Sequence, residues 1–381
     1  MSFLGKVLRT ILVPFRQKRL ILFESHPNKD DNAYPVYLYF KEHKPEYKLL
    51  WMTSRKSSVS SPNQLYYNSQ NTWQQIRFFF LIRTCGAIVT CDRFFKSHYD
   101  GQISLYLAHG SKTKKTRGIY EPGPVVDFVN LQSHFFDSVA EYDYRARKEQ
   151  LVYLGYPRCD WLYKNVDLSA FLKKIGVTGK YIIWLPTFRK NKAFKLDAHS
   201  ELFDNMGIPL IYNEEMLRSL NEFLIGRDYH IVYKPHPAQD VRTLTRMRLS
   251  NIHIINDEYL HEQGVQLYQM IAKSSALITD YSSVYYDYLL LDKPIATTLD
   301  DVETWKSARG FAFDLESMYA STNESLYTLD DLYSFIDDVL VEGKDTRGEE
   351  RRKIRDLTNM HTDGNSAQRV AEFIISKTAR K

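Results

Sequence analysis

The residues best placed for chemistry are two adjacent serines, Ser282 and Ser283, which follow Asp280. An apolar run over residues 276–279 precedes them, and residues 284–291 carry apolar and aromatic side chains at helical spacing, which predicts a strand, a turn and a helix. The serines then stand at the helix N-terminus, where unpaired backbone N–H groups and the helix dipole bind phosphate. The alternative is that Asp280 and the serines only cap the helix, which is the commonest use of these residue types.

Basic and hydroxyl side chains follow two further predicted strands. Thr187 and Arg189 come after residues 181–185, and Lys234 and His236 come after residues 230–233. No strand is followed by G-x-G-x-x-G and no Walker A sequence occurs, so a dehydrogenase or a P-loop ATPase has little support. Phosphate recognition in this chain is therefore expected to depend on side chains and helix termini.

The elements that must position these residues alternate between strands and helices. We expect strands at residues 20–23, 48–52, 87–90, 103–107, 126–131 and 151–154, and then at 181–185, 230–233, 252–255, 276–279 and 294–298. The clearest predicted helices cover residues 33–40, 73–83, 284–291, 332–341 and 366–376, with a charged segment at 344–355. Such alternation predicts parallel sheets that are covered by helices on both faces.

Length and strand pattern together indicate two domains. We divide the 381 residues into an N-terminal Rossmann-like domain over residues 1–168 and a C-terminal one over residues 169–381. The expected fold class is therefore α/β, with two Rossmann-like domains facing each other across a central cleft. Ligands of open α/β sheets bind beyond the carboxyl ends of the strands, and the unusual residues of this sequence gather at those ends.

The composition is that of an ordinary globular protein, with 44% hydrophobic and 25% charged residues. A net charge of +5 permits anionic partners, but no nucleic-acid-binding signature accompanies it. The three cysteines have neither metal-site spacing nor the even count of a disulfide scaffold, which indicates a reducing cytosol. No apolar run approaches the length of a membrane span.

Residues 1–19 nevertheless have the pattern of an amphipathic helix. Apolar side chains recur there at helical spacing, and basic side chains lie between and after them, as in helices that lie on anionic bilayers. The same apolar stripe could equally pack on the protein's own core. The N-terminus shows no cleavage site of a signal peptide.

Four segments carry a family resemblance. They are LAHGSKTKKT (107–116), LGYPRCD (154–160), VYKPHP (232–237) and ITDYSSVYYDYLLLDKPI (278–295), and their order and spacing resemble the CDP-glycerol glycerophosphotransferases of teichoic acid synthesis. ILFESHPNKDDNAYPVYLYF (21–40) and RGFAFD (309–314) are also similar to that family, so the resemblance covers almost the whole chain. It implies a two-domain GT-B fold that binds a CDP-activated polyol and passes polyol phosphate to a lipid-linked glycan at the cytoplasmic membrane face.

The resemblance also implies roles for individual residues. An acceptor hydroxyl attacks the phosphorus that carries glycerol, so the reaction needs a base and positive or dipolar groups around the phosphates. His109 would be the base, with Gly110 allowing a close backbone approach. His236, with Lys234, would stabilise the transferring or leaving phosphate. A histidine that only stabilises a turn at position 109, and one that is merely exposed at position 236, are the alternatives.

The same match implies the other substrate-binding residues, which are Ser282 and Ser283 for the pyrophosphate, Thr187 and Arg189 in a phosphate-side loop, Arg309 closing over the ligand, and Asp280 and Asp287 orienting these groups or a sugar hydroxyl. A divalent metal ion is compatible with phosphoryl transfer, but no carboxylate cluster in the sequence stands out as its site. Within LGYPRCD, Gly155 and Pro157 are expected to fix a turn, and Arg158 is expected to pair with Asp160.

The sequence departs from the family pattern after His109 and Gly110. Family members often continue with a Thr-Pro-Leu-Lys-like sequence, whereas this chain reads SKTKK at residues 111–115, which leaves the identity of the acceptor open. We assign the basic cluster at this place to an acceptor diphosphate or to anionic lipid headgroups, with a solvated basic face as the alternative. The cluster comprises Lys112, Lys114, Lys115 and Arg117.

We therefore expect a peripheral membrane enzyme at the cytoplasmic face that transfers glycerol phosphate from CDP-glycerol to a hydroxyl of a polyprenyl-diphosphate-linked glycan and releases CMP. The chain length favours a primase that adds one or a few units. The alternatives within the class are a CDP-ribitol ribitolphosphotransferase and a capsule polyol-phosphate transferase. A second enzymatic alternative is a GT-B glycosyltransferase that uses a nucleotide sugar. The alternative from another class is a catalytically silent membrane-bound scaffold, and the presence of both His109 and His236 argues against it.

Overall fold

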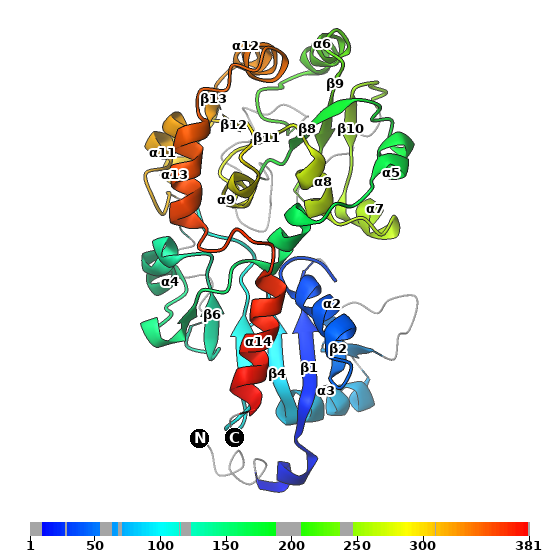
Figure 1. Cartoon of the computed structure of the whole chain (residues 1–381), viewed down its shortest axis with the longest axis vertical. Coiled ribbons are helices and arrows are strands. Elements are labelled where there is room, and N and C mark those ends of the chain that lie inside the picture. Colours follow the sequence, from blue (N-terminus) through cyan, green and yellow to red (C-terminus); the bar gives the residue numbers. More distant parts are fainter. Residues whose placement is uncertain are drawn as a thin grey trace. The chain divides into compact units, whose positions relative to one another are not determined.

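The computed structural model describes residues 10–26, 29–53, 63–67, 71–113, 115, 123–187, 207–236, 247–308 and 310–379. The chain splits into two compact units (Figure 1). The first comprises Met1–Ser111, Arg117–Asp160 and Met360–Lys381, and the second comprises Lys112–Thr116 and Trp161–Asn359. This division is less simple than one boundary after residue 168, because a short segment beyond Ser111 belongs to the second unit and the C-terminal segment belongs to the first.

The first unit contains a parallel sheet of seven strands in the order β3-β2-β1-β4-β5-β6-β7. The strands are β1 (Gln17–Glu24), β2 (Lys48–Thr53), β3 (Gln64–Tyr66), β4 (Cys85–Thr90), β5 (Ile103–Tyr106), β6 (Phe128–Asn130) and β7 (Leu151–Val152). The chain builds one side of the sheet outward from β1 and then the other side outward from β4. The order therefore reverses between these two strands, which is the place where open α/β sheets bind ligands.

Helices cover both faces of this sheet, which explains why its central strands are unbroken apolar runs. The helices are α2 (Ala33–His43), α3 (Thr72–Thr84), α4 (Asp137–Asp143) and α14 (Ser366–Ala379). Side chains alternate along β1: Ile21 and Phe23 share a core with α2 and α14, whereas Leu20 and Leu22 share a core with α3. Figure 1 shows α14, the last helix of the chain, lying along the sheet beside β4.

The second unit contains a parallel sheet of six strands in the order β10-β9-β8-β11-β12-β13. The strands are β8 (Lys180–Trp184), β9 (Tyr229–Tyr233), β10 (Ile252–Ile254), β11 (Ala276–Thr279), β12 (Ile295–Thr298) and β13 (Glu324–Leu326). The order reverses between β8 and β11, so the second unit repeats the Rossmann-like topology of the first. Its core joins Ile182 and Trp184 of β8 to Leu217, Leu220 and Leu224 of α6.

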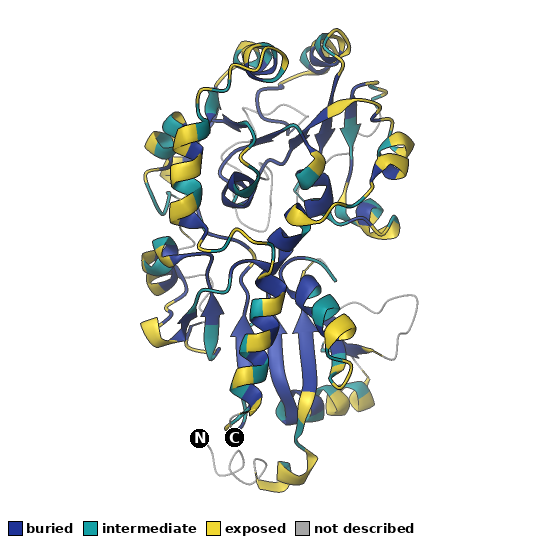
Figure 2. Cartoon of the chain, viewed as in Figure 1, coloured by how far each residue is buried: buried dark blue, intermediate teal, exposed yellow. Residues whose placement is uncertain are grey.

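The helices of the second unit are α5 (Ser169–Lys174), α6 (Glu214–Ile225), α7 (Asp257–Glu262), α8 (Leu267–Lys273), α9 (Val284–Tyr288), α10 (Val302–Ala308), α11 (Leu315–Thr322), α12 (Leu329–Ser334) and α13 (Gly348–Thr358). Figure 2 shows the strands of both sheets buried, whereas the helices expose their outward sides. None of the helices in the described ranges is long and apolar enough to cross a membrane.

The predicted strands all occur, with shorter ends at β6 and β7. Sequence reasoning missed β3 and β13, because three residues are too few to show a periodic pattern. The charged segment predicted at residues 344–355 is largely helical, since α13 covers Gly348–Thr358. The predicted helix at 332–341 is divided between α12 and π-helical turns over Phe335–Val341. Of the amphipathic helix predicted for residues 1–19, residues 1–9 lie outside the described residues, and its last part is wrong, because Val13–Phe15 form a 3-10 turn and β1 already begins at Gln17.

Candidate active site

His109 stands just beyond β5, at the carboxyl edge of the first sheet. The N–H of Leu107 still donates to the carbonyl of Thr90 in the neighbouring strand β4, at 2.8 Å. Ala108 and Gly110 on either side of the histidine both have positive φ, 60° and 127°, and both are buried. Only glycine takes a φ of 127° without strain, so Gly110 allows the sharp turn. The turn leaves 61% of the His109 side chain exposed.

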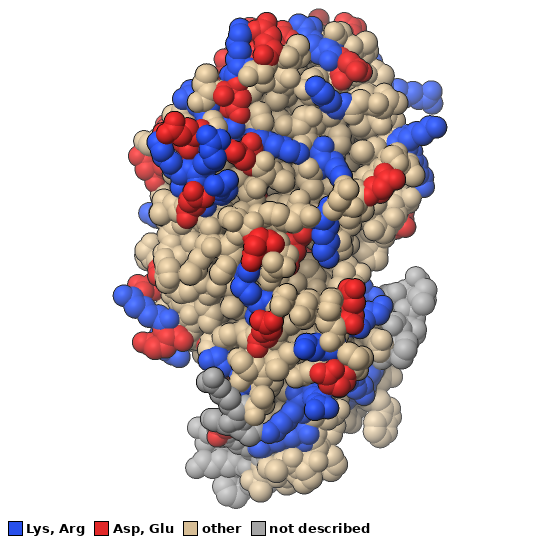
Figure 3. All heavy atoms as spheres, viewed as in Figure 1, with Lys and Arg blue, Asp and Glu red and all other residues tan. Residues whose placement is uncertain are grey.

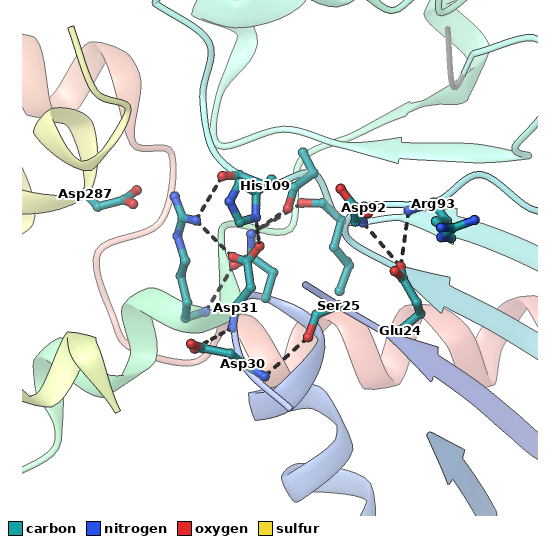
Figure 4. Close-up of polar contacts among 12 residues, drawn as sticks. Glu24, Ser25, Asp30, Asp31, Asp92, Arg93, His109 and Asp287 are labelled. Atoms are coloured by element: carbon teal, nitrogen blue, oxygen red, sulfur yellow. Dashed lines mark hydrogen bonds and ion pairs between the residues drawn. The ribbon is translucent and has the colours of Figure 1, made fainter. Parts of the chain in front are cut away.

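Asp31 orients the His109 ring. Its carboxylate bonds to Nδ1 of His109 (Figure 4), and only 4% of the Asp31 side chain is exposed. Burial alone would raise the pKa of Asp31, but the charges of His109 and Arg158 outweigh burial and hold this pKa at about 2. The Asp31 carboxylate in turn raises the pKa of His109. The pair is therefore a buried carboxylate that holds an exposed imidazole.

Arg158 completes this arrangement from a distant part of the chain. Its Nη1 donates to Oδ1 of Asp31 at 2.9 Å and to the carbonyl of His109 at 3.1 Å. Asn32 links the same segments, because its Nδ2 donates to the carbonyl of Ala108 and its Oδ1 accepts from the N–H of Arg158. Three separate segments thus fix one imidazole.

The expected pairing of Arg158 with Asp160 is wrong. Asp160 instead accepts hydrogen bonds from the N–H groups of Ser366 and Ala367, at 2.9 and 2.8 Å. It therefore caps the start of α14 rather than balancing the arginine. The expected structural role of Gly155 fits its φ of 75°, since a Cβ there would lie 2.5 Å from Oγ of Ser366.

A second carboxylate, Glu24, ties the two central strands of the first sheet together. It ends β1 with 1% exposure and accepts the N–H groups of Asp92 and Arg93, which follow β4, at 3.3 and 3.2 Å (Figure 4). Burial raises the pKa of Glu24 to about 7, although these hydrogen bonds oppose the shift. Glu24 thus shapes the strand ends beside His109 without facing solvent.

In the second unit, Asp280 ties the loop after β8 to the end of β11. Thr187 donates to this carboxylate through its backbone N–H, at 2.8 Å, and through Oγ1, at 2.6 Å. Asp280 is 0% exposed and Thr187 is 5% exposed. Because β8 and β11 flank the reversal of strand order, these residues shape the place where a ligand would bind in this unit.

Lys234 and His236 follow β9 in the same unit. Lys234 is buried, and its Nζ lies 2.8 Å from Oδ1 of Asp257, in the first turn of α7. His236 is half-buried. Any phosphate that reached Lys234 would therefore share this ammonium group with Asp257.

Ser282 and Ser283 are both half-buried at the start of α9. Ser283 is the N-cap residue, but its side chain makes no capping hydrogen bond, so the capping alternative does not account for it. Asp287, the fourth residue of α9, is 0% exposed and accepts a hydrogen bond from the hydroxyl of Tyr268 in α8. This burial favours an orienting role for Asp287 over direct contact with a ligand.

The basic segment beyond His109 is built into the second unit. The hydroxyl of Thr113 donates to the carbonyl of Tyr281, and the carbonyl of Thr113 accepts a hydrogen bond from the N–H of Ala312 at 2.8 Å. The N–H of Lys115 donates to the carbonyl of Gly310 at 3.2 Å. Lys115 is exposed and Lys112 is half-buried. Four of the predicted site residues lie outside the described residues, namely Lys114, Arg117, Arg189 and Arg309.

The described residues contain no group of three or more His, Cys, Asp or Glu side chains that could hold a metal ion. Sequence reasoning missed four polar residues of the two sites, namely Asp31, Asn32, Arg158 and Asp257. One signal was available, because Asp31 and Asn32 end the polar run that follows a predicted strand. Their partners lie far away along the chain, 78 residues for Asp31 with His109, and no local pattern encodes such a pairing.

Two units of Rossmann-like topology, each with polar residues at the carboxyl edge of its sheet, define the GT-B class of α/β proteins. Solved structures support this class. The structure of the wall teichoic acid polymerase TagF matches with a TM-score of 0.72 at 17% identity, covering 99% of this chain and 97% of that one. The Staphylococcus aureus MnaA–UDP structure matches with a TM-score of 0.55 at 14% identity, covering 94% and 96% of the two chains. The predicted GT-B-type fold is confirmed.

The family model for CDP-Glycerol:Poly(glycerophosphate) glycerophosphotransferase matches residues 7–376. The chain therefore belongs to this family of teichoic acid enzymes, as its motifs predicted. It is 23% identical over 350 residues to the teichoic acid poly(glycerol phosphate) polymerase of Bacillus spizizenii, covering 81% of each chain. It is 27% identical over 242 residues to the teichoic acid ribitol-phosphate primase of the same organism, covering 61% of this chain and 55% of that protein.

Proposed function

We propose that this chain transfers glycerol phosphate from CDP-glycerol to a hydroxyl of a lipid-linked glycan and releases CMP. Family membership supports the reaction class, and relatives named as glycerol-phosphate primases and polymerases support the donor. The observation that carries the proposal is the exposed His109 ring held by the buried Asp31 carboxylate. A scaffold that had lost its chemistry would have no need of this pair.

In this proposal His109 is the general base. Asp31 accepts a hydrogen bond from the protonated Nδ1 of His109. The lone pair of Nε2 is therefore available to the acceptor hydroxyl. The hydroxyl oxygen forms a bond to the phosphorus that carries glycerol, its proton passes to Nε2, and the bond from that phosphorus to the bridging oxygen breaks. The electron pair of the broken bond leaves on the phosphate of CMP. Arg158 keeps Asp31 ionised and thereby keeps the ring in this orientation.

The second unit would bind the donor. Asp280 orients Thr187, and Asp287 orients α9 through Tyr268, so both carboxylates would act without touching the ligand. The groups that would surround the phosphates are Thr187, Arg189, Lys234, His236, Ser282, Ser283 and Arg309, of which Arg189 and Arg309 rest on the family match alone. Positive and dipolar groups of this kind stabilise the charge that develops on the leaving CMP.

We further propose that the enzyme is peripheral to the cytoplasmic face of the membrane, where its acceptor would be anchored. The basic residues beyond His109, among them Lys112 and Lys115, would face the acceptor diphosphate. Extension by one or a few units, as expected of a primase, is supported by relatives that carry that name. The length distribution of the products distinguishes a primase from a polymerase.

The test is CMP release from CDP-glycerol, CDP-ribitol and a nucleotide sugar, each with a lipid-linked disaccharide as acceptor. We expect acceptor-dependent CMP from CDP-glycerol, and a fall of about a hundredfold or more in His109→Ala with little change in thermal stability. His134→Ala is the matched control, because His134 is also an exposed histidine of the first unit that pairs with an aspartate. Undiminished turnover in His109→Ala would contradict the proposed base.

CDP-ribitol is the second candidate donor, because the ribitol-phosphate primase is among the relatives at 27% identity. CMP from CDP-ribitol alone would select that reaction and keep the mechanism. Sugar transfer from the nucleotide sugar would select a glycosyltransferase. No product from any donor would leave the silent scaffold as the remaining reading.

A further inference from the structure

We propose that Asp92 and Arg93, which follow β4, bind the acceptor sugar that carries the reacting hydroxyl, and that Glu24 is the residue that positions them. We call residues 91–102, which connect β4 to β5, the acceptor loop. This inference rests on the proposed function and deepens it, because it names the residues of the first unit that would hold the acceptor at His109.

The acceptor loop contains no helix. Parallel strands are usually joined through a helix, and a long connection without one is commonly either functional or disordered. The far end of this loop is fixed to the preceding strand. The hydroxyl of Tyr99 donates to the carbonyl of Cys85 at 2.8 Å, and the side-chain amide of Gln102 donates to the carbonyls of Ile82 and Cys85, both at 2.9 Å. The loop is therefore anchored where it enters β5.

Glu24 anchors the other end of the acceptor loop. Its carbonyl accepts the N–H of Cys91 at 3.1 Å, and its Oε2 accepts the N–H groups of Asp92 and Arg93 at 3.3 and 3.2 Å. Glu24 is 1% exposed, so water does not compete for these bonds. The backbone of Asp92 and Arg93 is thereby fixed before any ligand binds, which reduces the ordering cost of binding.

The side chains of Asp92 and Arg93 are exposed, and neither makes an ion pair with any residue that the structure describes. Elsewhere on the surface, opposite charges are commonly close together. On much of the face in Figure 3, Lys and Arg side chains lie near Asp or Glu, as Lys353 does with Glu350. Two fixed charges of opposite sign that do not pair with each other are available to a ligand.

The ring of Tyr67 supports Arg93. The Cζ atom of Arg93 lies 4.5 Å from the centroid of this ring, and the ring in turn contacts Phe78 and Phe95, with centroids 6.3 and 6.4 Å away. A guanidinium that stacks on an aromatic face keeps its N–H groups free to donate at its edge. Arg93 is therefore held in place without using its hydrogen-bond donors on the ring.

Asp92 lies beside the proposed base. Figure 4 shows Asp92 between His109 and Arg93, at the carboxyl ends of the central strands. The charge of Asp31 is the main cause of the raised pKa of His109, and the charge of Asp92 adds to it. A sugar that donated a hydrogen bond to Asp92 would therefore be held next to the imidazole that takes the proton of its reacting hydroxyl.

A sugar fits these two side chains better than the phosphates of the donor. Sugar hydroxyls both donate and accept hydrogen bonds, so one ring can donate to the carboxylate of Asp92 and accept from Arg93. A phosphate oxygen only accepts, and its negative charge would be repelled by Asp92. The candidate phosphate-binding residues, such as Lys234 and Ser282, belong to the second unit. The acceptor loop is therefore assigned to the acceptor.

The test is initial-rate kinetics in which CDP-glycerol and the lipid-linked disaccharide are varied in turn. Asp92→Asn should raise the KM for the disaccharide about tenfold, because a neutral amide oxygen replaces a charged one. Arg93→Gln should raise it by a similar factor. In both variants the KM for the donor should change by less than about threefold.

Two variants of the first unit serve as matched controls for these changes. Glu42→Gln removes an exposed carboxylate from α2. Arg83→Gln removes a guanidinium that, like that of Arg93, lies over an aromatic ring, 3.4 Å from the centroid of Phe79. Both controls should leave the KM for the disaccharide unchanged.

Glu24→Gln tests the positioning role. The oxygen of the new glutamine can accept one of the two N–H groups, but its NH₂ group repels the other donor, so the KM for the disaccharide should rise several-fold while the KM for the donor stays unchanged. Burial raises the pKa of Glu24 to about 7, and the charged residues next to it are Asp92 and Arg93. In the wild type the KM for the disaccharide should therefore fall as pH rises through this range. In Glu24→Gln this dependence should disappear.

Binding of the disaccharide without donor gives an independent readout. Isothermal titration calorimetry on the His109→Ala variant measures this binding in the absence of turnover, and adding Asp92→Asn should weaken it about tenfold. Unchanged KM and unchanged binding in the Asp92 and Arg93 variants would overturn the inference, as would an equal rise in the KM for the donor. Absence of CMP release from every donor would reject the proposed reaction, and calorimetry would still decide whether the acceptor loop binds the sugar.

Discussion

The most informative residues are Asp31, Asn32 and Arg158, which hold His109 and its turn in place. Asp31 and Arg158 are almost completely buried, so their charges are screened less by water than surface charges would be. Asp31, held by Arg158, bonds to Nδ1 of His109 and leaves Nε2 as the nitrogen that faces solvent. Such an arrangement is more than a turn requires, because a histidine that only closed a turn would not need a buried ion pair behind it.

Asp31→Asn tests this reading at the scale of one residue. Asparagine tolerates the φ of 55° at this position but carries no charge, so turnover should fall about 10²–10⁴-fold. The base must be neutral to act, and Asp31 raises the pKa of His109. The rate of the wild type should therefore rise with pH through a pKa that is higher than the ordinary value of histidine. In Asp31→Asn this rise should move to lower pH, as a pH–rate profile would show.

The control for this change is Asp137→Asn, which removes the carboxylate beside the exposed His134 and should leave the profile unmoved. A fall in rate without any shift of the acidic limb would show that Asp31 is only structural.

The stability contributed by the ion pair of Asp31 and His109 should be lost as pH falls from the usual aspartate range toward about 2. It should also be lost as pH rises through the raised pKa of His109.

At the scale of elements, both sheets use the same device where their strand order reverses. A buried carboxylate at the end of one central strand accepts hydrogen bonds from the loop after the other. Glu24, the last residue of β1, accepts the N–H groups of Asp92 and Arg93 after β4. Asp280, directly after β11, accepts the N–H and the hydroxyl of Thr187 after β8. Two loops that a ligand would contact are thereby fixed to one another. Pre-organised loops of this kind reduce the ordering cost of binding.

Asp280→Asn should weaken donor binding for this reason. The oxygen of the new asparagine can accept a hydrogen bond from the N–H or from the hydroxyl of Thr187, but the NH₂ group of the same side chain repels the other donor. The KM for CDP-glycerol should therefore rise about tenfold, with a smaller change in kcat. Initial-rate kinetics with the donor as variable substrate measure this split. Asp337→Asn, which breaks the pair with Arg227 elsewhere in the same unit, should leave the KM unchanged. An equal effect in both variants would assign the loss to general destabilisation.

At the scale of the molecule, the first unit is completed by the last helix of the chain. After building the second unit, the chain returns and places α14 in the first core, where Val370 and Ile374 are 0% exposed. Asp160 caps the start of this helix. The first unit therefore cannot reach its full stability before α14 has been made.

Ile374→Ala should destabilise the protein by about 2–5 kcal/mol, because it leaves a cavity in a closely packed core. Urea unfolding followed by circular dichroism measures the loss. Glu372→Ala, on the exposed side of the same helix, should change the free energy of unfolding by no more than about 0.5 kcal/mol. A small effect of Ile374→Ala would mean that α14 contributes little to the first unit.

Much of the fold was already determined by the sequence. Apolar runs separated by helical patterns predicted the strands of two parallel sheets, because a strand buried on both faces needs an unbroken apolar run. Short edge strands such as β3, and a strongly charged helix such as α13, escaped prediction because their local patterns are weak. The family and its reaction class also followed from the sequence, through motifs such as LAHGSKTKKT and VYKPHP.

Only the tertiary structure decided which residues work together. The motifs identified His109, but its partners Asp31 and Arg158 come from other segments and meet only when parallel strands bring their carboxyl ends to one edge. The sequence likewise favoured pairing Arg158 with the nearby Asp160, whereas folding placed a helix N-terminus beside Asp160 and a buried carboxylate beside Arg158. Local patterns reflect interactions between neighbours along the chain, and a hydrogen-bonded site depends on distances that the packing of the elements sets.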